Sequence, residues 1–216
     1  MEIYTYGKPD AEFVLLQAVD DHDLEGIESE VKLIGEMSDV PFCLRAMKAA
    51  DWNNDLSPWR APAVFGNEDF GGGAKEFLKE FMTLTDEKTA AGTDRKYIIG
   101  GYSLAGLFAL WAACEKDCFA GAAAASPSVW FPDFTGFIRE NRIHARAVYL
   151  SLGDKEEKTK NRVMATVGDC IRETCDIIAA GGCECTLEWN PGNHFRNADL
   201  RTAKAFAWVM NRLREL

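Results

Sequence analysis

One stretch decides the fold, Tyr97-Ile98-Ile99-Gly100-Gly101-Tyr102-Ser103-Leu104-Ala105-Gly106-Leu107-Phe108-Ala109-Leu110-Trp111. Its first residues form an apolar, β-prone run and its last form an apolar helical run, so Ser103 lies at the turn between a strand and a helix. A serine exposed in such a strained turn needs small neighbours, because the strand and helix pack closely there. Gly101, Ala105 and Gly106 meet that demand. The stretch predicts a nucleophilic serine, against the alternative of a glycine-rich helix entry.

Outside this stretch, short apolar runs alternate with helical periodicities. This pattern indicates an α/β domain with a mostly parallel central sheet and helices on both faces. The expected strands, each apolar enough to be buried on both faces, are residues 13–19, 42–47, 96–101, 120–125, 147–152 and 185–189. Residues 3–6 are an expected edge strand.

Apolar stripes at helical spacing predict helices that cover the sheet. They comprise Ile27, Val31 and Ile34; Ala74, Phe77, Leu78, Phe81 and Met82; Val163, Val167, Ile171, Cys175 and Ile178; and Leu200, Ala203, Ala207, Met210 and Leu213. The third stripe is expected to stop at Gly181-Gly182, because a residue with positive φ commonly ends a helix. These stripes are core faces without assigned chemistry.

Residues 50–73 lack a sustained period and are expected to form a long ordered loop. The loop leaves the carboxyl end of its strand, where open α/β sheets bind ligands. Trp52 and Trp59 are therefore expected either to wall a pocket or to pin the loop onto the core, and the sequence does not choose between these roles.

Length and charge narrow the class of protein. The 216 residues fit a single domain, 1–216, that buries about 70% of its unfolded surface. The net charge of −10, without a basic stripe or tail, argues against nucleic-acid binding.

Sequence patterns also indicate the cellular location of the protein and whether it binds a metal. The beginning of the chain lacks the pattern of a secretory signal, and no apolar run has the length of a membrane helix, so we expect a cytoplasmic protein without membrane contact. The seven cysteines are expected to be reduced. Cys183-Glu184-Cys185 has no second Cys or His pair near it, so neither a metal nor another cofactor is expected.

A serine hydroxyl needs a base to take its proton and a third group to orient that base. His194 is the expected base, because it follows the last strand and precedes the final helix. His22 follows the first main strand and is a weaker candidate. His144 lies between Arg142 and Arg146 and is expected to be solvated.

The orienting acid is expected in the turn after the strand 147–152, which contains Asp154, Glu156 and Glu157. Glu156 is preferred because it has room to reach back over the sheet edge, with Asp154 second and Glu157 third. The alternative is that these carboxylates only favour the start of the following helix.

The candidates occur in the order Ser103, Glu156, His194, which is the serine, acid, histidine order of α/β-hydrolases. An oxyanion hole is expected to combine the backbone amide of Leu104 with an amide from the loop around Val19 and Asp20.

The sequence resembles the α/β-hydrolase superfamily, in particular its branch of esterase D-like and enterochelin (siderophore) esterase-like proteins. The resemblance rests on residues 101–110, 126–131, 153–156 and 192–194, with residues 54–59 similar to a pocket loop of that branch. It departs from the branch at Tyr102, where histidine is frequent, and at Ala105, where glycine is usual. The strands that usually precede the first parallel strand are shortened, and no large lid domain is expected.

The resemblance implies hydrolysis of a small-molecule carboxylic ester through an acyl-enzyme on Ser103. We expect Trp52, Trp59, Tyr102 and Trp130 to contact the substrate. Two alternatives remain: an acyltransferase of the same fold, because an alcohol can intercept the same acyl-enzyme, and a noncatalytic ligand-binding protein on a hydrolase scaffold. The sequence leaves substrate identity and oligomeric state open.

Overall fold

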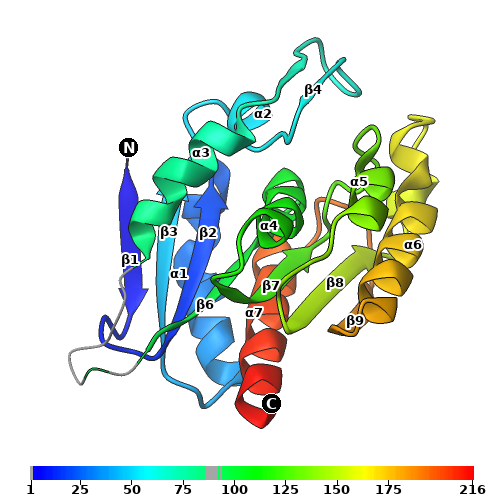
Figure 1. Ribbon diagram of the computed structural model, residues 1–216. Coiled ribbons are helices and arrows are strands. Elements are labelled where there is room, and N and C mark those ends of the chain that lie inside the picture. The colour runs from blue at the N-terminus through cyan, green and yellow to red at the C-terminus, as the bar shows by residue number, and fades with distance from the viewer. Residues whose placement is uncertain (1, 86–91, 93) are drawn as a thin grey trace.

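A seven-stranded sheet forms the centre of the computed structural model, which describes residues 2–85, 92 and 94–216 (Figure 1). The strand order is β1-β3-β2-β6-β7-β8-β9. Strand β1 is antiparallel to β3, and all other neighbours are parallel. The strands are β1 (Ile3–Gly7), β2 (Phe13–Val19), β3 (Phe42–Lys48), β6 (Lys96–Tyr102), β7 (Phe119–Ala125), β8 (Ala147–Gly153) and β9 (Glu184–Asn190). The predicted mostly parallel sheet is confirmed, and the expected edge strand is β1, which runs antiparallel.

Helices cover both faces of this sheet (Figure 1). One face packs against α1 (Asp21–Met37) and α7 (Ala198–Glu215), which contribute Ile27, Ile34, Phe206 and Met210 to a buried cluster. The other face carries a second cluster with residues from α3 (Ala74–Phe81), α4 (Leu104–Glu115), α5 (Phe134–Glu140) and α6 (Val167–Ala180). Helix α6 ends before Gly182, whose φ is 85°, as the sequence predicted.

Two expectations about burial are wrong. Strand β9 was expected to be buried on both faces, but it pairs with β8 alone at the edge of the sheet and most of its side chains are half-buried. Val163 was expected on the buried face of α6, yet it is 42% exposed and precedes the short helix η3 (Met164–Thr166). The side chain of Asn161 accepts the amides of Val163 and Met164, which gives this segment a separate start.

The segment 50–73 is ordered but contains more regular structure than expected. It holds a short helix α2 (Trp52–Asp55) and a two-stranded ribbon of β4 (Arg60–Ala61) and β5 (Phe70–Gly71), and α3 with η1 (Met82–Leu84) follows. The hydroxyl of Ser57 accepts the Gly72 amide and so ties the ribbon back to α2. Helix α2 and strands β4 and β5 are too short to produce a period that the sequence can reveal.

The parallel register brings four turns to one edge of the sheet. Tyr102 at the end of β6 lies beside Ala125 at the end of β7, and Gly153 at the end of β8 lies beside Asn190 at the end of β9. The segments that follow these strands therefore meet at the carboxyl edge, where open α/β sheets place their ligand sites.

Candidate active site

Ser103 occupies a strained turn between β6 and α4. Its φ is 57° and its ψ is −117°, a conformation that costs a non-glycine residue about 1–3 kcal/mol. The turn depends on small neighbours, as the sequence predicted. A Cβ atom added to Gly101 would lie 2.6 Å from Cβ of Ala105, and one added to Gly106 would lie 3.1 Å from the carbonyl oxygen of Gly101.

The His194 ring lies against the Ser103 hydroxyl. Its Nε2 is 2.9 Å from Oγ of Ser103, which is hydrogen-bonding distance. The loop that carries the ring is tied down by the Tyr102 hydroxyl, which donates to the carbonyl oxygen of His194 over 2.6 Å. Burial raises the pKa of Tyr102 to about 12, so this hydroxyl keeps its proton and its role as donor at neutral pH.

Glu156 holds the other side of the ring, with its Oε2 2.7 Å from Nδ1 of His194. The carboxylate lies in the short helix η2 (Glu156–Lys158) and is almost fully buried. Its Oε1 accepts the Gly153 amide over 2.7 Å and the Ser126 hydroxyl over 2.8 Å. Burial alone would raise the pKa of Glu156, but the interactions with His194, Gly153 and Ser126 outweigh burial and lower it.

The competing acids have other contacts. Asp154 accepts the amide of Gly192 over 2.7 Å and so links the β8 turn to the His194 loop. Glu157 lies 3.4 Å from the guanidinium of Arg172. Of the three carboxylates in this turn, the structure brings Glu156 to His194.

The other histidines lie elsewhere. His22 is exposed in the first turn of α1, with Nδ1 3.6 Å from the Glu25 carboxylate. His144 is exposed in the segment before β8, where its amide donates to the carbonyl of Ala113.

The expected oxyanion donors are placed as follows. Leu104 is the first residue of α4, so its amide belongs to the helix N-terminal donors that lack an intrahelical partner. Val19 ends β2, and Asp20 caps α1. The Asp20 amide donates to Oδ2 of Asp23 over 3.2 Å, so it is available to a substrate oxygen only when this capping contact opens. The oxyanion hole stays a prediction.

A cavity of about 410 Å³ opens beside His194 and Glu156. Its apolar wall includes Trp130, Met164 and Val167, and Phe195, 91% exposed, lies at the cavity next to His194. Lys155 and Lys158 also line it.

Of the expected substrate contacts, Trp130 lines this cavity. Trp59 pins its loop, because its indole donates to the carbonyl of Pro132 and its ring packs on Phe131. Trp52 lines a separate hollow with Asp20 and Lys48, and the Tyr102 ring lies against the His194 ring. Contact of these side chains with a substrate stays a prediction.

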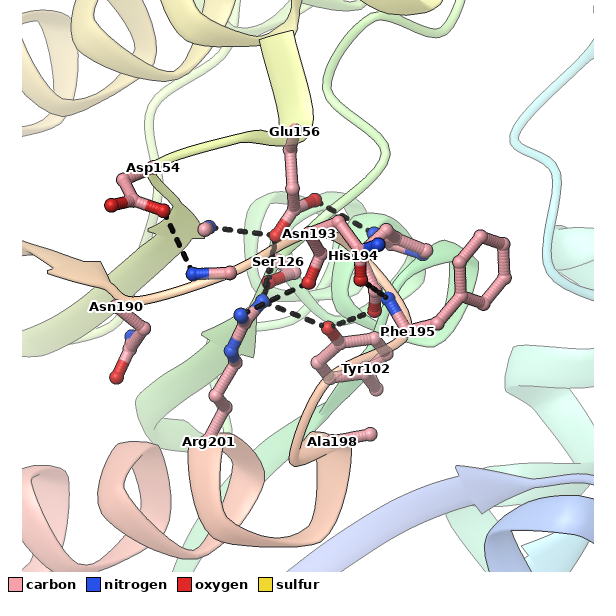
Figure 2. Close-up of polar contacts among 12 residues, drawn as sticks. Tyr102, Ser126, Asp154, Glu156, Asn190, Asn193, His194, Phe195, Ala198 and Arg201 are labelled. Carbon is pink, nitrogen blue, oxygen red and sulfur yellow. Dashed lines mark hydrogen bonds and ion pairs between the residues drawn. The ribbon is translucent and has the colours of Figure 1, made fainter. Parts of the chain in front are cut away.

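Three polar residues of the site were not predicted from the sequence. The Ser126 hydroxyl donates a hydrogen bond to Glu156, and the Ser128 hydroxyl lies 3.3 Å from that of Ser103. Arg201 reaches from α7 to Oε1 of Glu156 over 2.7 Å (Figure 2). A signal for Arg201 exists in the sequence, because it lies four residues before Ala205 and eight before Val209, on the apolar face of its helix.

The described residues contain no group of three or more His, Cys, Asp or Glu side chains that could hold a metal ion. Within residues 2–85, 92 and 94–216, no helix is both long and apolar enough to span a membrane.

Comparison with known proteins places the chain by its structure. No family model and no curated protein matches its sequence. The siderophore hydrolase EstA from Aspergillus nidulans matches with a TM-score of 0.73 and 19% identity, over 94% of this chain and 84% of that one. An IroE-like serine hydrolase from Shewanella oneidensis matches with a TM-score of 0.73 and 15% identity, over 95% and 74%.

The enterobactin esterase FES from Shigella flexneri also matches, with a TM-score of 0.62 and 14% identity. The match covers 98% of this chain and 55% of that one. The chain has the α/β-hydrolase fold, as its sequence predicted. The resemblance to the siderophore-esterase-like branch is confirmed as a likeness of structure, and at these identities it shows the fold alone.

Proposed function

We propose that this protein is a serine hydrolase that cleaves small carboxylic esters through an acyl-enzyme on Ser103. The observation that carries the proposal is the unbroken hydrogen-bonded path from Ser103 Oγ to His194 Nε2, 2.9 Å, and from His194 Nδ1 to Glu156 Oε2, 2.7 Å. These distances lie within the reach required for proton transfer to a general base. The hydrolase and esterase names of proteins that share the fold support the same reaction class.

In this proposal each group has a role. His194 takes the proton of Ser103 as its Oγ attacks the ester carbonyl carbon, and Glu156 stabilises the resulting imidazolium. The Leu104 amide, together with an amide near Val19 and Asp20, stabilises the oxyanion. The imidazolium then protonates the departing alcohol. A water molecule, deprotonated by His194, then attacks the acyl-enzyme, and the imidazolium returns this proton to Oγ of Ser103 as the acid leaves.

A panel of aryl and alkyl esters tests this function. We expect turnover of at least one class, and Ser103→Ala should lower kcat by about 10⁵-fold or more, since removal of a serine nucleophile alone has such an effect. Addition of an alcohol acceptor separates hydrolysis from acyl transfer: a new ester as the main product would replace the hydrolase assignment with an acyltransferase. Absence of turnover with every ester, together with tight binding of an intact one, would favour a noncatalytic binding protein.

A further inference from the structure

Arg201 is a buried cation of the candidate site whose hydrogen bonds go to residues other than Ser103. It is 1% exposed and lies in the first turns of α7. Figure 2 shows its guanidinium reaching from the helix toward Glu156 and the His194 loop. The acceptors of its hydrogen bonds are Tyr102 Oη at 3.1 Å, Ser126 Oγ at 3.1 Å, Glu156 Oε1 at 2.7 Å, the Pro191 carbonyl at 3.3 Å and the Asn193 carbonyl at 3.0 Å.

These acceptors belong to separate segments of the chain. They follow or end β6, β7, β8 and β9, which are the four strands whose turns build the site. Only arginine carries five N–H donors in one rigid plane, so it can bind several fixed oxygens at once. A lysine at position 201 would keep the charge without this fork. Arg201 thereby fixes the acid and the histidine loop relative to each other.

The guanidinium also shares one carboxylate with the imidazole. Arg201 binds Oε1 of Glu156, whereas His194 binds Oε2. A positive charge at this distance stabilises the ionised carboxylate and opposes a second positive charge on the ring. Both effects disfavour proton uptake by the Glu156 and His194 pair. Removal of the Arg201 guanidinium is therefore expected to favour proton uptake by this pair.

Other charged groups surround the pair and stay unchanged in the variants proposed below. Asp154 lies in the β8 turn and accepts the Gly192 amide. Lys155 and Lys158 lie on the cavity wall with Glu156. From β6, the Tyr102 hydroxyl faces Arg201. Arg201 differs from all of these because it binds the carboxylate directly while buried.

We propose that Arg201 is a positioning residue that holds Glu156 and the His194 loop in place and sets the lowest pH at which His194 works as a base. The inference rests on the proposed function for its effect on turnover. Its effect on proton uptake does not depend on activity, so the two ideas can fail separately.

The test compares Arg201→Met, Arg201→Lys and the control Arg172→Met. Arg172 pairs with Glu157, the residue after Glu156, so its variant removes a nearby cation that does not touch the pair. Proton uptake by the His194 ring is followed by NMR titration, with His194→Gln assigning its signals, and kcat/KM is measured against pH with an ester that the wild type cleaves. Circular dichroism establishes the folded fraction at each pH.

Arg201→Met is expected to move both midpoints upward by about one pH unit, which is the usual effect of a nearby charge on a titrating group. Arg201→Lys should leave the midpoints in place but lower kcat about tenfold, because misplacement of reacting groups slows the reaction. Arg172→Met should change neither quantity. If Arg201→Met does not fold, Arg201→Gln, which keeps two N–H donors, takes its place with the same expected shift.

Midpoints equal to those of the wild type in a folded Arg201→Met or Arg201→Gln, with kcat unchanged per folded molecule in Arg201→Lys, would overturn the proposal and leave Arg201 a purely structural residue. A shifted NMR midpoint in a protein that cleaves no ester would instead reject the proposed function and keep the role of Arg201.

Discussion

At the scale of single residues, the site holds two features that destabilise the folded state and that an ordinary turn does not need. Ser103 adopts a left-handed φ of 57°, and Glu156 is buried as a carboxylate. Neighbouring residues compensate for each of these two features. The small residues Gly101 and Ala105 permit the turn, and several hydrogen bonds hold the charge of Glu156. Backbone strain at a serine, together with a buried charge close to it, is typical of sites that activate a nucleophile.

Glu156→Gln tests the choice of acid at this scale. Loss of the carboxylate charge should lower kcat about 100-fold or more, because a neutral amide no longer stabilises the imidazolium. Asp154→Asn is the matched control. Its oxygen still accepts the Gly192 amide, so activity should stay within a few-fold of the wild type. Steady-state kinetics on one ester measures both, and a larger loss in Asp154→Asn than in Glu156→Gln would reverse the assignment.

At the scale of elements, the local sequence determines the structure of some segments after the parallel strands and not of others. The turn between β6 and α4 depends on its small residues, so the local sequence predicts this turn. The start of α1 is also determined by the local sequence, because the side chains of Asp20 and Asp23 each accept the other residue's backbone amide. The segment with α2 and the β4–β5 ribbon is held by contacts such as Ser57 to Gly72, which no periodicity reveals.

The first turn of α1 carries a pH-dependent contribution to stability. Burial, reinforced by the neighbouring Asp20 carboxylate, raises the pKa of Asp23 to about 6. The folded state thus binds a proton more tightly than the unfolded state does, so the free energy of unfolding falls as pH rises from about 4 to about 6. Above that window the penalty is complete.

Asp23→Asn should therefore increase the free energy of unfolding at pH 7 by about 1–2 kcal/mol and flatten its pH dependence between pH 4 and 6. Asp21→Asn in the same turn is the control, because it removes an exposed carboxylate that takes no part in the capping contacts between Asp20 and Asp23. Glu30, whose pKa burial also raises, supplies a background slope common to all three proteins. Urea titrations at several pH values measure the effect, and equal slopes in Asp23→Asn and the wild type would contradict it.

At the scale of the whole molecule, the site exists because distant segments converge on one sheet edge. The sequence predicts that convergence for Ser103, Glu156 and His194, since each follows a strand of one parallel sheet and parallel strands end at the same edge. The structure confirms the fold class and brings these three side chains into contact.

The surrounding contacts could not be predicted in the same way. Arg201 interrupts an apolar helix face, a pattern that identifies a buried charge but not its partner, because the partner is set by how α7 packs on the sheet. The hydrogen bonds of Tyr102 and Trp59 to backbone carbonyls depend on which side of the backbone these residues face. Such contacts follow from the tertiary arrangement rather than from local sequence.

The most direct test of the central claim, that Ser103 is an activated nucleophile, is covalent labelling with a fluorophosphonate followed by intact-protein mass spectrometry and peptide mapping. We expect one adduct on Ser103, absent from Ser103→Ala and formed far more slowly in His194→Gln. A folded wild type that acquires no adduct, or a Ser103→Ala protein labelled as fast as the wild type, would contradict it.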